Sequence, residues 1–385
     1  MDNWPGAGTH EGRAASGPVS FLTAESCVRY LIARGLLDVP SIVRHGLHVD
    51  EIPGRNRNFR VVCGPAQRWF VKQAPTEEIG VPGPLGIEAA LYHWAASSGL
   101  LRDLCPRWVH HDSTESILIL ELESAAVSFH ELTTDHGPDR YSQAIRLLAG
   151  ALAATHQIPL ATLEAIPGVL PDSPPWVMDI GRPAPGSLRG YSPAQLKVLQ
   201  GIQRHEGAMD ALQQLRESWR SECLIHGDIK WNNLLLRVPG GGRPDSVLIL
   251  DWELAQLGDP AWDVGAGFHA LLTEAILGLD LGEAISPSEA VVQMSATIPG
   301  LHQAHHVFWQ EYRAVAGLDD QAAVRMLDRL PRMTALRLIK SAYEWAQAEL
   351  VMPRRAAGVL QLGLNMLCHP AAALGTVLGL REGTP

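Results

Sequence analysis

The sequence predicts an α+β protein with two lobes, in which a small antiparallel sheet precedes a larger, mostly helical part. Short apolar runs separated by turn residues fill the first third, and helical periodicity covers most of the rest. A length of 385 residues allows about two to three lobes or domains. We expect a disordered tail over residues 1–17, a first lobe over 18–123 and a second, helical lobe over 124–385.

The first lobe is expected to begin with a helix and to continue with strands around a second helix. Thr23 is a good N-cap for an amphipathic run that ends before Gly35, a residue that favours the position after a helix. Gly64 and Pro65 predict a turn between two strands. Periodicity predicts strands over Arg57–Cys63 and Arg68–Gln73, a helix over Ile87–Ser97 and a strand over Ile117–Leu120.

The second lobe is expected to be helical, with one long interruption. The proline-rich stretch Pro159–Gly190 predicts a loop or extended segment, and Ser192 followed by Pro193 is a typical helix start. Further helices are predicted over Tyr141–His156, over Asp263–Leu279 and over most of Leu301–Leu380, the last with breaks at Pro331, Pro353 and Pro370.

The middle of the chain contains the residues that indicate chemistry. Apolar runs at Leu234–Leu236 and Val247–Leu250 flank a glycine-rich turn and predict two paired strands. Asp228 and Asn233 precede the first strand and Asp251 follows the second, so pairing would bring the three side chains to one end. Two of these oxygen-bearing side chains can hold Mg²⁺, and the third can act as a base toward a hydroxyl.

The composition argues against several classes of function. Lys+Arg total 31 against 41 Asp+Glu, and this net charge of −10 disfavours nonspecific nucleic-acid binding. The five cysteines are dispersed without metal-binding spacing, which is typical of reduced thiols. The sequence lacks an apolar run of transmembrane length and an N-terminal signal peptide. We therefore expect a cytoplasmic protein that binds neither nucleic acid nor membrane.

Several charged residues have partners that the sequence suggests. Lys72 lies in an apolar strand, where a buried ammonium needs an anionic partner, and Glu88 in the next helix is the obvious one. His226 is expected to brace its loop by hydrogen bonds rather than to react. Asp259 or Asp263 can cap the helix that follows them, or Asp263 can brace the same loop.

In combination, these motifs resemble the aminoglycoside phosphotransferase family, which shares the protein-kinase-like fold with choline kinases and related small-molecule kinases. The resemblance implies a kinase that uses ATP and Mg²⁺, with a nucleotide-binding first lobe and a catalytic, substrate-binding second lobe. It extends from about residue 40 to about residue 345. It rests on His226-Gly-Asp228 with Asn233, Asp251-Trp-Glu253, Gly258-Asp259-Pro260 with Trp262-Asp263, Lys72 with Glu88, Ala151–His156 and Phe308–Gly317.

By this resemblance, Asp228 is the catalytic base, and Asn233 and Asp251 hold Mg²⁺. Lys230 is a departure, because small-molecule members often have histidine at this position and protein serine/threonine kinases have lysine. A lysine here can contact the transferred phosphoryl group and stabilise the charge of the transition state.

The resemblance also assigns the nucleotide site. Lys72 binds the phosphates of ATP and is held by Glu88, and Glu121 to Glu123 form the hinge whose backbone reads adenine. The turn Pro53–Asn58 has one glycine and is therefore not a glycine-rich kinase loop. Asn58 and its neighbours can offer amide donors to phosphate, or the segment can be a polar hairpin tip.

The resemblance and the intact set of site residues predict transfer of the γ-phosphoryl group from ATP to a hydroxyl of a small molecule, aminoglycoside-like or another alcohol. A first alternative is a kinase for Ser or Thr of a precursor peptide in lanthipeptide- or thioamitide-like natural-product biosynthesis, together with a separate lyase. A second is a pseudokinase that binds a partner protein. The segment Pro159–Gly190 and the helical tail after Pro353 are expected to shape the acceptor pocket.

Overall fold

The computed structural model confirms the predicted α+β class, because the strands of the first third form an antiparallel sheet and most of the remaining elements are helices. The predicted tail at residues 1–17 lies outside the described part of the chain. The structure describes residues 21–74, 83–123, 126–129, 131–132, 138–166, 170–183, 190–279 and 287–381.

The chain divides into two compact units. The first contains the described residues up to Leu85 together with Val109–Leu122, and the second contains Gly86–Trp108 together with Glu123 and the residues after it. Helix α3 (Pro84–Ser98) therefore belongs almost wholly to the second unit, although its place in the sequence put it in the first lobe. Side-chain hydrogen bonds from this helix to later segments of the second unit account for the difference.

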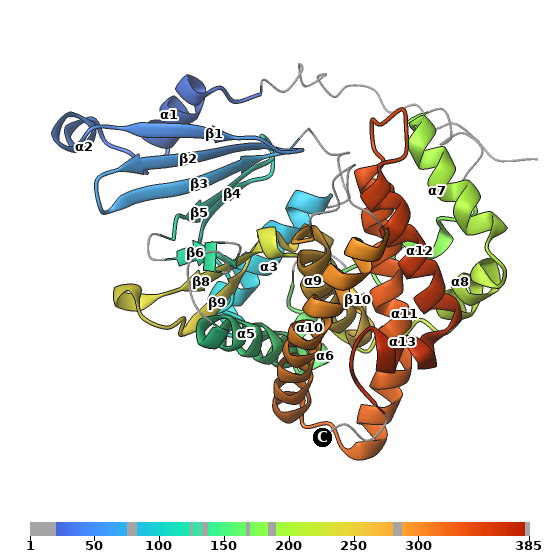
Figure 1. The fold of residues 1–385 in the computed structure, drawn as a ribbon. Coiled ribbons are helices and arrows are strands. Elements are labelled where there is room, and N and C mark those ends of the chain that lie inside the picture. The colour runs from blue at the N-terminus through green and yellow to red at the C-terminus, as the bar shows by residue number, and fades with distance from the viewer. Residues whose placement is uncertain are drawn as a thin grey trace, which may run out of the picture. The chain divides into compact units, whose positions relative to one another are not determined.

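The first unit contains a five-stranded sheet with the order β1-β2-β3-β5-β4 (Figure 1). The pairs β1–β2, β2–β3 and β3–β5 are antiparallel. The apolar runs predict β2, β3 and β5, whereas β1 and β4 are half-polar and form because adjacent strands supply hydrogen-bond partners. The strands are β1 (His48–Ile52), β2 (Arg57–Cys63), β3 (Gln67–Gln73), β4 (Trp108–Asp112) and β5 (Ile117–Glu121).

Helices α1 (Ala24–Ala33) and α2 (Val39–His45) complete the first unit. As predicted, α1 begins at Thr23, whose side chain accepts from the backbone of Ser26 in a reciprocal capping box. Its apolar face packs on the sheet. The buried cluster includes Cys27, Leu31, Phe59, Val61, Val71, Ile117 and Ile119.

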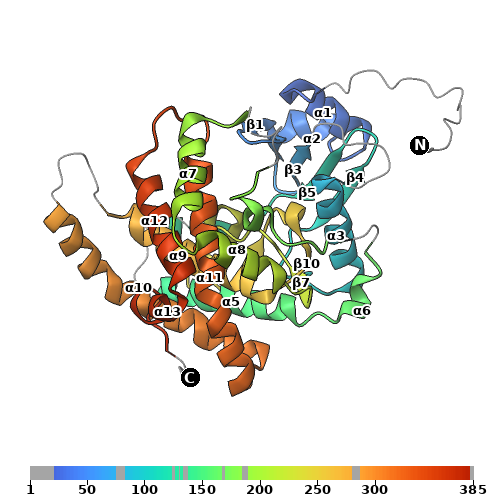
Figure 2. The same cartoon turned by 90° about the vertical axis from the view of Figure 1, so that its right-hand side faces the viewer.

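The second unit is mostly helical. Helix α11 packs against α9 and α12, α5 packs against α10, and α7 lies beside α11 and α12 (Figure 2). Besides α3, the helices are α5 (Pro138–His156), α6 (Leu160–Leu163), α7 (Pro193–Arg204), α8 (Ala208–Glu217), α9 (Pro260–Leu277), α10 (Pro287–Ala316), α11 (Asp320–Trp345), α12 (Arg354–Cys368) and α13 (Pro370–Thr376). Short 3-10 turns are η1 (Trp176–Asp179), η3 (Trp231–Asn233), η4 (Pro239–Gly241) and η5 (Trp252–Leu254).

Two small sheets lie among these helices. Strand β7 (Cys223–Ile225) pairs with β10 (Gln256–Gly258), and β8 (Leu234–Arg237) lies between β6 (Ala126–Ser128) and β9 (Ser246–Ile249). Strands β8 and β9 are antiparallel, with the first residue of β8 opposite the last residue of β9. The predicted pair of strands in the middle of the chain is therefore confirmed.

The predicted break at Pro331 is wrong, because α11 continues through this residue. Proline removes one backbone donor from a helix and usually bends or ends it. Here both halves of α11 contain buried residues, and the helix packs on α9 and α12 along its length. Tertiary packing therefore outweighs the local cost, whereas α12 begins after Pro353 and α13 begins at Pro370 as expected.

Within the described residues, no single helix is long and apolar enough to cross a membrane. Helices α12 and α13 are long and apolar enough only when taken together, and the chain bends by 118° at the break between them.

Candidate active site

The Asp228 loop, defined here as His226–Asn233, connects β7 to β8 and requires a glycine near its start. Gly227 has φ +83, a value that side chains rarely adopt. A Cβ atom at Gly227 would lie 2.3 Å from the carbonyl oxygen of Leu254. The close approach of these two backbone segments positions the loop beside the residues that follow β9.

Asp263 of α9 holds the start of this loop. Its two carboxylate oxygens accept from the backbone N–H groups of His226 and Gly227, at 2.6 and 3.0 Å. Asp259 instead caps α9 by accepting from the backbone N–H of Ala261 at 2.9 Å. The sequence left both roles open for Asp263, and the hydrogen bonds select the brace.

His226 fixes the loop through both ring nitrogens. Its Nδ1 accepts from the backbone N–H of Asp228 at 3.1 Å, so its Nε2 is the protonated nitrogen and donates to the carbonyl of Leu250 at 2.8 Å. Burial lowers the pKa of His226, which favours this neutral form. Because neither nitrogen is available for proton transfer, the ring has the bracing role expected from the sequence.

Asp228 follows the brace and is surrounded by cations. Lys230 Nζ lies 2.6 Å from Oδ2, while Lys340 Nζ and Arg337 Nη2 lie 2.8 and 3.2 Å from Oδ1. Burial raises the pKa of Asp228, but the charges of Arg337, Lys340 and Lys230 outweigh it and hold the pKa well below its ordinary value. The carboxylate is therefore ionised at neutral pH and can accept a hydrogen bond from a hydroxyl.

Arg337 and Lys340 of α11 are the site residues that sequence reasoning missed. They lie more than one hundred positions after Asp228, so no local spacing connects them to the loop. The signal that could have found them is a pair of cations, three residues apart, in the otherwise apolar run Ala335–Lys340. Charged residues inside a buried helix face need a buried partner.

Asn233 and Asp251 come together through the β8–β9 pair. The backbone N–H of Leu250 donates to the carbonyl of Asn233 at 2.8 Å, which places Asp251 one residue farther along. Asn233 Nδ2 donates to the carbonyl of Asp228 at 3.0 Å, and this contact fixes the amide so that Oδ1 remains as the acceptor. Asp251 adopts a left-handed conformation, φ 63 and ψ 56, and its N–H donates to the hydroxyl of Tyr92.

The donor chemistry of this pair fits Mg²⁺. An amide oxygen and a carboxylate are hard ligands, and Mg²⁺ is usually held by one or two protein oxygens, waters and substrate phosphates. Among the described residues, no group of three or more His, Cys, Asp or Glu side chains is arranged to hold a metal. A metal at Asn233 and Asp251 would therefore depend on a bound nucleotide for further ligands.

The predicted nucleotide residues are distributed over both units. Asn58 of β2 is directly opposite Lys72 of β3, so their side chains share one face of the sheet. Lys72 is buried in the first unit and Glu88 is buried in the second, and their pairing remains a prediction. Glu121 ends β5 opposite Trp69. At the other end of the expected hinge, Glu123 pairs with Arg237 at 3.0 Å.

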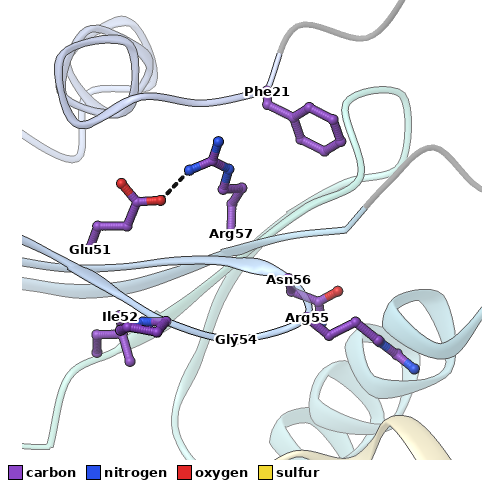
Figure 3. Close-up of a pocket in the computed structure, with 8 residues that line it drawn as sticks. Phe21, Glu51, Ile52, Gly54, Arg55, Asn56 and Arg57 are labelled. Atoms are coloured by element: carbon purple, nitrogen blue, oxygen red, sulfur yellow. Dashed lines mark hydrogen bonds and ion pairs between the residues drawn. The ribbon is translucent and has the colours of Figure 1, made fainter. Parts of the chain in front are cut away.

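Residues Pro53 to Arg57 of the β1–β2 turn line a pocket of roughly 350 Å³ in the first unit (Figure 3). Arg57 points toward Glu51 and forms an ion pair with it. Asn58 Oδ1 is buried and has no hydrogen-bond partner among the described residues, and a Cβ at Gly54 would lie 2.9 Å from Asn58 Nδ2. The side chain of Asn58 thus packs closely under the turn.

Comparisons with known proteins agree with this architecture. The family model described as the phosphotransferase enzyme family matches residues 49–306. An ethanolamine kinase structure from Plasmodium vivax is similar, with a TM-score of 0.51 and 13% identity over 87% of this chain and 86% of that one. This likeness confirms the protein-kinase-like fold.

Two further solved structures are similar at lower scores. A choline kinase from Streptococcus pneumoniae has a TM-score of 0.47 and 15% identity, over 89% of this chain and 98% of that one. A macrolide 2′-phosphotransferase from Brachybacterium faecium has a TM-score of 0.42 and 17% identity, with the same coverage of 89% and 98%. No match was found among curated protein sequences.

Proposed function

The chain belongs to the phosphotransferase enzyme family, and from this premise we propose that it transfers the γ-phosphoryl group of ATP to a hydroxyl of a small molecule. The observation that carries the proposal is the convergence of Asp228, Asn233 and Asp251 at one end of the β8–β9 pair. A base beside two hard metal ligands is the arrangement that phosphoryl transfer needs.

In the proposed reaction, the acceptor oxygen forms a bond to the γ-phosphorus as the bond from that phosphorus to the bridging oxygen of ADP breaks. Asp228 accepts the hydrogen bond of the acceptor hydroxyl and receives its proton late, because the transition state is loose. Its low pKa makes Asp228 a weak base, so orientation of the hydroxyl is its main contribution. The proton then passes from the carboxyl group to solvent.

The remaining roles follow from position and charge. Lys230 lies beside Asp228 with its side chain 46% exposed, and it can donate to the phosphoryl group in flight. Asn233 and Asp251 would hold Mg²⁺, which neutralises phosphate charge when bound. Lys72 and Asn58, on one face of the first sheet, are proposed to bind phosphates.

The protein-kinase-like Lys230 and the Arg-Asn-Arg-Asn-Phe-Arg segment at residues 55–60 are the sequence features that slightly favour a peptide acceptor. The contact between Lys230 and Asp228 accounts for this residue with either type of acceptor. It therefore gives no preference for a peptide, and we propose the small-molecule acceptor.

Binding of nucleotide in the presence and absence of Mg²⁺ tests the proposal. We expect ATP with Mg²⁺ to raise the melting temperature, and we expect this shift to fall in Asp251→Ala, because the variant loses the charged metal ligand. Asp245→Ala, which changes an exposed aspartate in the β8–β9 turn, is the matched control. If no nucleotide changes the melting temperature, the result would favour the alternative of a pseudokinase that binds a partner protein.

A further inference from the structure

The cation cluster around Asp228 contains more positive charge than this carboxylate requires. Among the described residues, the carboxylates that contact Lys230, Arg337 and Lys340 are Asp228 and Glu344. Glu344 lies 3.3 Å from Lys340 and is 50% exposed, so solvent screens its charge. Lys230 is 46% exposed and is screened in the same way. Two largely buried cations, Arg337 and Lys340, therefore face one buried carboxylate, which leaves a positive excess at the place where the acceptor hydroxyl must bind.

Arg337 does not supply this excess to a ligand, because its guanidinium is committed to the loop. It donates to the carbonyls of Gly227 and Ile229, at 3.3 and 3.0 Å, as well as to Asp228. Its side chain is only 3% exposed and lies over the ring of Trp262. Arg337 is a positioning residue, which leaves the two lysines to contact a ligand.

The use of lysine at these two positions is unusual for this chain. The sequence contains four lysines, at positions 72, 197, 230 and 340, against 27 arginines. Arginine forms fixed bidentate pairs, whereas an ammonium on a flexible stem has three donors that can turn toward a new partner. Lys340, 12% exposed, can thus keep one contact with Asp228 and donate to a ligand.

One turn beyond Lys340, α11 presents an aromatic surface. Tyr343 lies three residues later and makes edge contacts with the rings of Trp176 and Tyr191, at 5.4 and 5.7 Å between centroids. Trp176 is 49% exposed. Ser192, the residue after Tyr191, connects its segment to the end of α11, because its Oγ donates to the carbonyl of Ala346 at 2.6 Å. An exposed aromatic face beside a lysine gives a ligand both apolar contact and a charge partner.

We propose that the acceptor is a hydroxyl compound that also carries an anionic group, a carboxylate or a phosphate, and that Lys340 binds this group. This inference rests on the proposed function, because the anionic group is expected to bind Lys340 while the reacting hydroxyl of the same acceptor lies at Asp228. A cationic acceptor, such as an amino alcohol, would meet Lys340 as a like charge and would be repelled.

Four glycerol derivatives test the charge of the acceptor without changing its hydroxyls. Glycerate and glycerol 3-phosphate are anionic, glycerol is neutral and 3-amino-1,2-propanediol is cationic. With four lysines, a protein that contains lysine labelled with ¹³C at Cε gives four signals, which single Lys→Met variants assign. The signals are followed while a non-hydrolysable ATP analogue with Mg²⁺, and then each glycerol derivative, is added.

We expect the nucleotide analogue to move the signals of Lys72 and Lys230. The two anionic compounds should then shift the signal of Lys340 and leave unchanged the signal of Lys197, which is exposed on α7. The relative shifts from glycerate and glycerol 3-phosphate distinguish a carboxylate from a phosphate. Lys340→Met should weaken binding of the preferred anion by about tenfold, as expected for one lost charge-assisted hydrogen bond, while Lys197→Met should not.

Three results would overturn the inference. If nucleotide moves its two lysines but no anion moves Lys340, the acceptor site is not anionic and the proposed function stands. The same holds if the neutral or cationic compound moves Lys340 as much as the anions do. If nucleotide moves no lysine signal, the proposed function itself fails, and the acceptor inference fails with it.

Discussion

The Asp228 loop and the β1–β2 turn are both proposed to contact phosphate groups, yet different interactions hold them in place. The first part of the loop, residues 226–229, is buried, and groups from other elements hold it: Asp263 of α9, Arg337 of α11 and the carbonyl of Leu250 after β9. The turn is mostly exposed, and Arg57 at its end pairs locally with Glu51. The loop therefore has one conformation set by tertiary contacts, whereas the turn has few constraints.

This difference corresponds to two proposed contributions, one to the rate of the reaction and one to the affinity for nucleotide. The loop must hold a carboxylate within hydrogen-bond reach of the reacting hydroxyl, and a displacement of about 1 Å there can cost about a hundredfold in rate. A turn that contacts nucleotide phosphates contributes to binding in the ground state and the transition state alike, which changes affinity more than turnover. Substitutions in the two regions should accordingly give different kinetic results.

The largest effect is expected from Asp228→Asn in the loop. The amide lacks the charged oxygen that orients the acceptor hydroxyl and cannot receive its proton, so kcat should fall by about 10² to 10⁴-fold, while the affinity for nucleotide stays within about threefold. Release of ADP measures the first quantity, and calorimetric titration measures the second. Asp245→Asn, in the exposed β8–β9 turn, is the control. Activity within tenfold of the wild type would remove Asp228 from its proposed role.

The next effect is expected from Arg337→Met, which removes the clamp but leaves Asp228 in place. Three acceptors lose their donor, so the free energy of unfolding should fall by about 3 kcal/mol, and kcat should fall while KM for nucleotide changes little. Denaturant unfolding and steady-state kinetics measure the two. Arg325→Met, at an exposed position on the same helix, should change neither. Equal stability of both variants would contradict the clamp.

The two regions also differ in how far the sequence predicts them. The sequence predicts that Asp228, Asn233 and Asp251 lie together because two strands joined by a short turn follow Asn233 and precede Asp251, and the structure contains this strand pair. Arg337 and Lys340 could not be placed, because the docking of α11 on α9 brings them to the loop. Local sequence patterns therefore predict site residues that are close in the sequence, but not the residues that a distant helix contributes.

The same limit explains the differences in the fold. Strand β2 has the predicted bounds, Arg57–Cys63, because its apolar residues alternate along a half-buried sheet. Strand β1 has no such alternation and exists because β2 offers it a complete register. Pro331 stays inside α11 for an equivalent reason, since packing on both sides outweighs one lost hydrogen bond. In each case a tertiary partner overrides a local preference.

We expect the free energy of unfolding to fall as the pH is lowered, and we assign part of this pH dependence to buried histidines. Burial lowers the pKa of His226 and of His269, and it lowers the pKa of His305 to about 3. Below about pH 6.5 the unfolded chain binds protons that these folded histidines do not, so stability falls as pH falls, by about 1.4 kcal/mol per pH unit for each histidine.

Denaturant unfolding between pH 7 and pH 5 measures this slope, and His305→Gln should reduce it by the share of one histidine. An unchanged slope in this variant would show that His305 is not the source. Asp228 contributes in a different range: its pKa is depressed, so the stability from its ionised form is complete above about pH 4 and is lost only below that. Asp228 therefore does not contribute to the acid slope between pH 7 and pH 5.

The smallest effect is expected in the β1–β2 turn, from Asn58→Ala. The variant removes one neutral amide from a proposed phosphate contact, so the affinity for ATP should fall by about three- to tenfold, and kcat should change by less than about twofold. Within the part of the chain that the structure describes, Asn58 Oδ1 has no hydrogen-bond partner, so its loss should not lower stability measurably. The comparison between turn and loop fails if Asn58→Ala lowers kcat as strongly as Arg337→Met, because the turn would then position the reacting groups.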